Sequence, residues 1–194
     1  MPVNVTGVKQ LQKAMRAVDD DLFKEMSTGI KAVMLPIRDK ARGYLPRQDE
    51  VLSGWGTATA SIATANYRAF PAYNYSVARA GIKYKAGSNK RNRNGFSVTN
   101  YVSNESAPGA IYETAGRKNP GGTQGGASLN PDASIQFIQA LPEMMNNYRS
   151  TGRKRDGRLI YKAWAEDSGK VYKKVVDAVE KTANKFNAKQ TKAA

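Results

Sequence analysis

Residues 107–126 read APGAIYETAGRKNPGGTQGG, and the interpretation of the whole chain depends on this stretch. A short apolar run, Ile111 and Tyr112, leads into Glu113 and Gly116, and glycines follow a basic pair. The pattern predicts a strand that ends near Tyr112 and passes into a glycine-rich connection. Because glycine-rich loops after strands often hold phosphate groups, the first question is whether this one does.

The loop lacks the residues that a phosphate-binding loop requires. Its spacing from Gly116 to Gly121 imitates a P-loop, but Gly122 stands where the phosphate-contacting lysine is needed. The dinucleotide fingerprint G-x-G-x-x-G is also missing there. We therefore predict a flexible connection and no nucleotide cofactor.

Composition narrows the chemistry further. The chain has 194 residues, which fits one domain spanning 1–194, and it contains neither His nor Cys. Zinc sites, and Cys or Ser nucleophiles activated by His, are thereby excluded. Trp55, Tyr73, Tyr75 and Trp164 could form a ligand pocket, although core or interface packing is the more common role of such aromatic residues.

Acidic pairs offer the remaining route to metal chemistry. The clusters at 19–21, 49–50 and 166–167 could hold magnesium, as the carboxylates of nucleases do. Neighbouring residues seldom face one ion together, and two of these clusters precede predicted helices, where capping explains them. We predict no catalytic residue, no metal and no cofactor, and keep a metal nuclease as the least favoured alternative.

The net charge of +15 predicts a partner rich in phosphate or carboxylate. No apolar window is long enough to span a membrane, and the first residues lack the pattern of a secretory signal. Basic loop residues would neutralise duplex phosphates without reading bases, or would serve only as solubilising surface. The candidates for contact with DNA or with a neighbouring protein are Lys90, Arg91, Arg93, Arg117, Lys118, Arg153, Lys154 and Arg155.

Apolar periodicity predicts an α+β fold. Helical spacing of apolar residues over 22–41 indicates a long helix, kinked at Pro36 and ending near residues 44–46. Alternation between residues 52 and 102 predicts an antiparallel sheet, and a helix-like run follows Asp132. A last helix over 168–186 would bury Val171, Val175, Val179, Ala183 and Phe186.

Taken in order, these segments resemble the neck and tail-completion (head–tail connector) family of siphovirus-type phages. The opening VNVTGVKQLQKAM resembles the family's strand and first helix, and ARGYLP resembles the end of its second helix. Tyr112, Glu113 and Gly116 match its signature of an aromatic residue, a glutamate and a glycine closing a strand. The closing GRLIYKAWAEDSGKVYKKVVDAVEKTANKF resembles its final helix, while residues 121–158 depart from the pattern as an insertion.

The resemblance implies a long N-terminal helix packed on an antiparallel sheet, with a C-terminal helix beside it. It further implies a non-enzymatic virion protein, assembled in the host cytoplasm, that forms a homo-oligomeric, six-fold ring. That ring would join the connector or stopper to the tail-terminator or tail-tube proteins, and duplex DNA would pass through it. Tyr112, Glu113 and Gly116 would then form a turn at the subunit interface.

Two points stay open from the sequence. The basic loops would face either the DNA lumen or an acidic neighbouring ring. The alternative function is a free, basic nucleic-acid-binding protein that is indifferent to sequence. Stoichiometry separates the two, because the ring needs extensive subunit contacts whereas the alternative needs affinity for duplex as a free protein.

Overall fold

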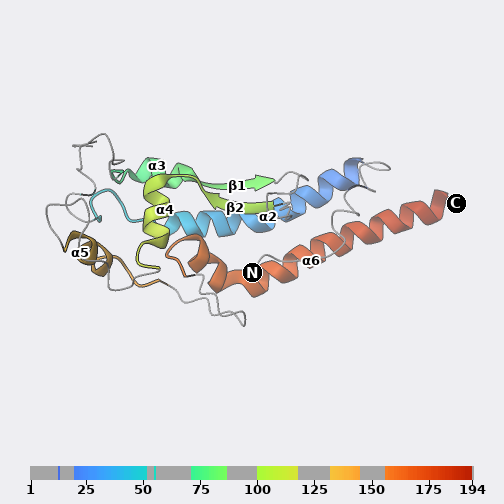
Figure 1. Ribbon diagram of the computed structural model, residues 1–194. Coiled ribbons are helices and arrows are strands. Elements are labelled where there is room, and N and C mark those ends of the chain that lie inside the picture. Colours follow the sequence, from blue (N-terminus) through green and yellow to red (C-terminus); the bar gives the residue numbers. More distant parts are fainter. Residues whose placement is uncertain are drawn as a thin grey trace. The chain divides into compact units, whose positions relative to one another are not determined.

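The computed structural model describes residues 13, 20–51, 55, 71–86, 100–117, 132–144 and 156–193 (Figure 1). Helices and a two-stranded antiparallel sheet make up these parts, with a long helix near each end of the sequence, so the predicted α+β class is confirmed. In order, the elements are α2 (Asp20–Gly43), α3 (Tyr75–Gly81), β1 (Ile82–Ala86), β2 (Asn100–Asn104), α4 (Ala107–Thr114), α5 (Ala133–Gln139) and α6 (Ile160–Ala193).

The chain divides into two compact units. The first comprises Met1–Ile37, Tyr84–Tyr101 and Asp167–Ala194, and the second comprises Arg38–Lys83 and Val102–Glu166. Helices α2 and α6 and both strands contribute residues to each unit. We describe each unit by itself.

Helix α2 follows the predicted pattern closely. Asp20 and Asp21 occupy its first turn and Lys40 and Arg42 its last, which complements the helix dipole at both ends. The helix ends at Gly43, one residue before the predicted range of 44–46, and Pro36 lies inside it. The predicted stripe is buried at Leu22, Met26, Ile30, Ile37 and Ala41.

An apolar cluster forms the core of the first unit. Leu22, Met26 and Ile30 are buried, and four partly buried side chains pack against them: Phe23, Met34, Val179 and Phe186. A Cβ at Gly29 would lie 3.3 Å from the Cβ of Ala178, so α2 and α6 approach closely in this unit. Burial of these apolar side chains supplies most of the unit's stability. Its free energy depends on the apolar area removed from water and hardly on the relative orientation of the side chains.

Aromatic residues build part of the second unit. The Trp55 ring lies 5.0 Å from the rings of both Tyr73 and Phe137, measured between centroids. The Tyr73 hydroxyl donates to the Pro46 carbonyl at 2.6 Å, and the Trp55 indole donates to the Pro71 carbonyl at 2.9 Å. Each buried polar end therefore has a partner, and core packing accounts for Trp55 and Tyr73 as the more common role predicted.

The strand predicted at Ile111 and Tyr112 is wrong, because both residues lie in helix α4. Ser106 caps that helix by accepting a hydrogen bond from the Gly109 N–H at 3.2 Å, and Pro108 lies in its first turn. These are helix-starting signals, and they outweigh the β-propensity of the short apolar run. Within the sheet predicted between residues 52 and 102, residues 75–81 form helix α3 instead, for a similar reason: the Asn74 side chain caps this helix by accepting from the Val77 N–H.

Two further helix boundaries differ from the prediction. Helix α6 runs over Ile160–Ala193 instead of 168–186, so Glu166 and Asp167 lie inside a helix and do not cap one. Helix α5 is short and ends at Gln139, before Pro142. Most of the predicted strand region between 52 and 70, and the first helix apart from Lys13, lie outside the described residues.

Candidate functional site

The junction between α4 and α6 concentrates buried polar groups in the second unit. Glu113 lies in the last turn of α4 with only 4% of its surface exposed. Its carboxylate accepts hydrogen bonds from the backbone N–H groups of Leu159 at 2.5 Å, Ile160 at 3.2 Å and Tyr161 at 3.0 Å. These are the unpaired donors at the start of α6, so a residue 46 to 48 positions upstream caps this helix.

Gly157 allows this approach. A Cβ added at that position would lie 2.3 Å from Oε1 of Glu113, so any other residue would displace the carboxylate from its hydrogen bonds. Glycine is therefore required by the close packing of the carboxylate against the backbone that leads into α6.

Arg158 caps the other helix in return. Its guanidinium donates to the carbonyls of Tyr112 at 3.0 Å and Ala115 at 2.9 Å, which belong to the end of α4, and to Pro142 at 2.5 Å. Arg158 is 5% exposed. Two buried groups of opposite charge thus satisfy the free backbone groups of the two helix ends, an arrangement we call the Glu113–Arg158 clamp.

Burial shifts both groups of the clamp against ionisation. It raises the pKa of Glu113, while the three backbone N–H donors and the charge of Arg117 act in the opposite direction. Burial likewise lowers the pKa of Arg158, and the negative charge of Glu113 opposes that shift. Since both carboxylate oxygens already accept hydrogen bonds, the arrangement suits a structural cap and leaves little capacity for proton transfer or metal binding.

Gly116 and Arg117 follow α4 directly. Gly116 has φ of +80°, and a Cβ there would lie 2.8 Å from Cγ2 of Ile138, so the turn after α4 favours glycine at this position. Arg117 donates from Nε to the Asp156 carbonyl at 2.8 Å, and its guanidinium carbon lies 4.8 Å from the centre of the Tyr161 ring. Arg117 therefore helps to hold the backbone before α6, a role that the sequence did not predict.

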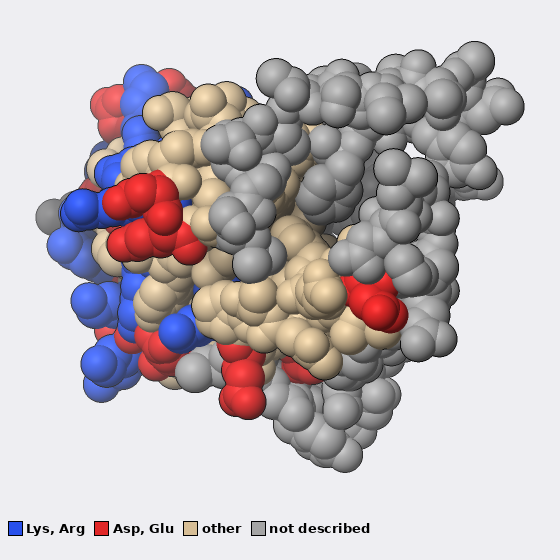
Figure 2. All heavy atoms as spheres, turned by 90° about the vertical axis from the view of Figure 1, so that its left-hand side faces the viewer, with Lys and Arg blue, Asp and Glu red and all other residues tan. Residues whose placement is uncertain are grey.

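The other basic candidates lie outside the described residues: Lys90, Arg91, Arg93, Lys118, Arg153, Lys154 and Arg155. Their contact with DNA or with a neighbouring ring stays a prediction, as does the subunit-interface role of Tyr112, Glu113 and Gly116. Figure 2 shows one face on which Lys and Arg side chains lie beside Asp and Glu side chains, with uncharged residues between them.

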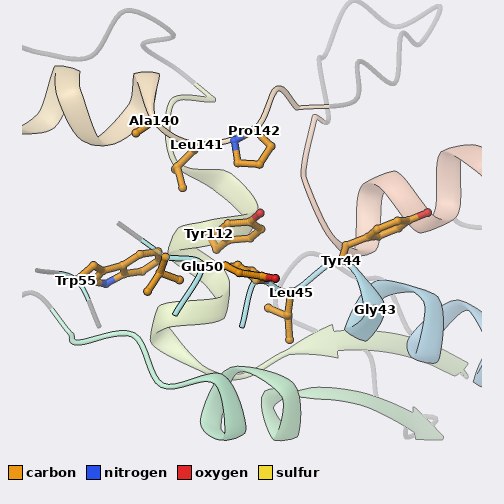
Figure 3. Close-up of a pocket in the computed structure, with 11 residues that line it drawn as sticks. Gly43, Tyr44, Leu45, Glu50, Trp55, Tyr112, Ala140, Leu141 and Pro142 are labelled. Atoms are coloured by element: carbon orange, nitrogen blue, oxygen red, sulfur yellow. The ribbon is translucent and has the colours of Figure 1, made fainter. Parts of the chain in front are cut away.

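A pocket of about 390 Å³ opens in the second unit, and Glu50 is one of the residues that line it. From the sequence, Glu50 was a candidate only for metal binding. Figure 3 shows Tyr112 between Leu141 and Pro142 on one side and Glu50 and Leu45 on the other, with the Tyr44 ring directed away from them. The Tyr44 hydroxyl donates to Glu166 on α6. Trp55, which the sequence suggested for a pocket or for packing, serves both purposes.

The part of the chain that the structure describes contains neither a candidate metal site nor a candidate membrane-spanning helix. Its carboxylates nowhere gather into a group of three that could hold a metal ion. No helix among these residues is both long and apolar enough to cross a membrane. No family model matches the chain, and neither a curated protein nor a solved structure shows significant similarity to it.

Proposed function

We propose that this protein is a non-enzymatic structural subunit of a phage head-to-tail interface, a neck or tail-completion component. It would assemble into a homo-oligomeric ring, six-fold in symmetry, between the head connector or stopper and the tail terminator or tail tube. Its place would be in the virion, after assembly in the host cytoplasm. The proposal rests on the sequence resemblance, and the structure contributes one supporting observation.

That observation is the Glu113–Arg158 clamp. Glutamate and glycine of the signature stretch serve the architecture, Glu113 as a cap for α6 and Gly116 as a positive-φ turn. An enzyme would need an accessible, chemically competent group, whereas Glu113 and Arg158, the buried charged side chains among the described residues, are engaged with backbone. A buried, hydrogen-bonded clamp suits a subunit that must keep its shape while neighbours and DNA exert force on it.

The net charge of +15 supports the same proposal independently of the fold. Basic residues that contact phosphates without reading bases would let duplex DNA pass through the ring. Charge of this size would also guide docking onto an acidic neighbouring ring.

Sedimentation velocity at moderate salt, with and without a labelled duplex, tests the proposal. A closed oligomer that leaves most of the duplex free is the expected result. A monomer that carries the duplex down, and releases it as salt rises, would contradict the ring.

A charge-reversal variant extends this test to the basic loop. We expect replacement of Arg153, Lys154 and Arg155 by Glu to impair assembly or DNA passage while the circular dichroism spectrum stays unchanged. Normal assembly of this variant would remove the loop from the proposal.

One observation favours the alternative function, a free nucleic-acid-binding protein. Exposed lysines recur along α6, among them Lys170, Lys174 and Lys181, whose spacing places them along one side of the helix. Asp177 shares this side, so the stripe is not purely basic. If the stripe binds duplex, changing these three lysines to Gln should weaken binding and reduce its salt dependence by about three phosphate contacts.

A further inference from the structure

The pocket of the second unit has apolar and aromatic walls and one carboxylate. Leu45, Trp55 and Tyr112 are almost fully buried and form its walls, and Glu50, which is exposed, lies at its edge. Its volume of about 390 Å³ falls in the range of sites that accept small ligands or single side chains. All the lining residues belong to one unit.

Among the described residues, no lysine or arginine forms an ion pair with Glu50. One oxygen, Oε2, accepts the Arg47 backbone N–H at 2.8 Å. By contrast Glu25, Glu105 and Glu166 are paired with Lys185, Lys83 and Lys40, as Asp20 and Asp21 are with Lys24. Glu50 thus presents a carboxylate to the pocket with its second oxygen available.

The Tyr112 hydroxyl adds a second acceptor. Among the described residues it has no hydrogen-bond partner, and its ring forms a wall of the pocket. Burial raises the pKa of this hydroxyl, Arg158 opposes the shift, and the charge of Glu50 adds to it. The hydroxyl therefore stays protonated, and its oxygen accepts hydrogen bonds close to a negative charge.

This combination selects a cation carried on an aliphatic stem. A carboxylate and a phenol oxygen would accept from an ammonium or guanidinium group, and the stem would cover Leu45 and the ring faces of Trp55 and Tyr112. We propose that the pocket receives a lysine or arginine side chain of a second copy of this chain, with the cation bound to Glu50.

Charge complementarity identifies the second copy as the occupant. The chain carries 31 lysines and arginines against 16 acidic residues, so a second copy offers many cationic side chains to an unpaired carboxylate, and this local attraction has to exceed the mutual repulsion of two chains of charge +15. Glu50 is the one acidic residue among those described that lines the pocket, and it forms no ion pair with them. The inference rests on the proposed ring, since it concerns the contact between neighbouring subunits.

Sedimentation velocity over a concentration series tests the contact, with Glu50→Lys and Glu50→Gln compared with the wild type. Asp49→Lys and Asp49→Asn are the matched controls, because Asp49 is the exposed neighbour of Glu50 and does not line the pocket. We expect Glu50→Lys to raise the concentration needed for association at least about tenfold and Glu50→Gln to raise it less. The Asp49 variants should associate like the wild type.

Failure of the pocket contact and failure of the proposed ring would give different results. Association of Glu50→Lys at the wild-type concentration would overturn the pocket contact and leave the ring intact. A wild type that stays monomeric at every concentration would overturn both the second copy as occupant and self-assembly of the free chain. Unchanged thermal unfolding of the Glu50 variants checks that a lost contact does not reflect a lost fold.

A small probe tests the chemistry of the pocket directly. Nα-acetyl-lysine methylamide should shift the Trp55 indole N–H resonance saturably, and the uncharged norleucine analogue should not. Glu50→Gln should abolish the shift. Absence of any saturable shift in the wild type would overturn the assignment of a cationic side chain to this pocket.

Discussion

The two units hold together by different means. The first is built around Leu22, Met26 and Ile30, whose contribution depends on buried area, and its charged pairs lie at the surface. The second depends on the Glu113–Arg158 clamp, in which all hydrogen bonds except that from Arg158 to the Pro142 carbonyl join residues more than forty positions apart in sequence. Apolar packing tolerates exchange of one side chain for another of similar volume, whereas a buried polar clamp fails when any one member is removed.

Removing the clamp's carboxylate should have the largest effect. Glu113→Ala would leave three backbone N–H groups of α6 unsatisfied and the charge of Arg158 without its acidic neighbour. We expect a loss of about 3–5 kcal/mol in the free energy of unfolding, measured by urea denaturation.

Glu143→Ala is the control for this variant, since Glu143 is an exposed carboxylate in the same unit. It should unfold like the wild type. Hydrogen exchange should show protection lost at the amides of residues 159–161 in Glu113→Ala. Unchanged protection there would mean that the clamp does not hold the start of α6.

Truncation of a side chain in the apolar cluster tests whether the first unit depends on packing. Met26 is fully buried, so Met26→Ala removes its packing and leaves a cavity, at a cost of roughly 2–5 kcal/mol. Met26→Leu, which nearly conserves volume, should cost less than about 1.5 kcal/mol. Equal losses from the two variants would show that this core does not depend on packing.

The turn after α4 should respond by an intermediate amount. Gly116→Ala forces a side chain onto a φ of +80° and brings its Cβ within 2.8 Å of Ile138, so about 1–2 kcal/mol should be lost. Gly169→Ala is the opposite control, because it lies inside α6 with nothing within 4 Å of the added Cβ. That variant should gain up to about 1 kcal/mol in urea denaturation.

The pH dependence of stability should distinguish the clamp from surface charges. Burial places the pKa of Glu113 in the folded chain above its ordinary value of 4.5, so the folded state holds this proton more tightly than the unfolded state. The stability that the proton confers is complete below the ordinary value and is lost as pH rises through the folded pKa. Glu113→Gln should lack this slope in urea midpoints measured between about pH 4 and 7, and an identical slope in both proteins would contradict the shift.

Sequence patterns predicted the parts of this fold that depend on period and end signals. The stripe over 22–41, the acidic start of α2 and its end at Gly43 all follow from local rules. The strand predicted at Ile111 and Tyr112 is wrong because Ser106, five residues before Ile111, caps a helix that includes both residues. Capping residues deserve the same weight as apolar pattern in so short a segment.

The clamp could not be predicted from the sequence. Glu113 and Arg158 meet backbone groups far away along the chain, and no local pattern specifies those partners. The two glycines, Gly157 and Gly116, could have been predicted to matter, since a glycine beside a helix end often marks a close approach of two segments or a positive φ. The pocket around Glu50 combines three separate segments, which is likewise beyond a local pattern.

The smallest effect should come from the surface pair Lys185–Glu25 of the first unit. Its Nζ and carboxylate oxygen lie 2.5 Å apart, yet the two side chains are 45% and 42% exposed. Water and salt screen such a pair, and holding two long side chains in one geometry costs entropy, so the hydrogen bond adds little net stability. Lys185 and, to a smaller extent, other lysines nearby lower the pKa of Glu25, so Lys185→Ala leaves this carboxylate in a basic environment.

We expect Lys185→Ala and Glu25→Ala each to unfold at the wild-type urea midpoint, at low and at high salt. A clear loss in either variant, of the size expected for Met26→Ala, would mean that the first unit also depends on specific charged contacts, and the contrast between the two units would then disappear.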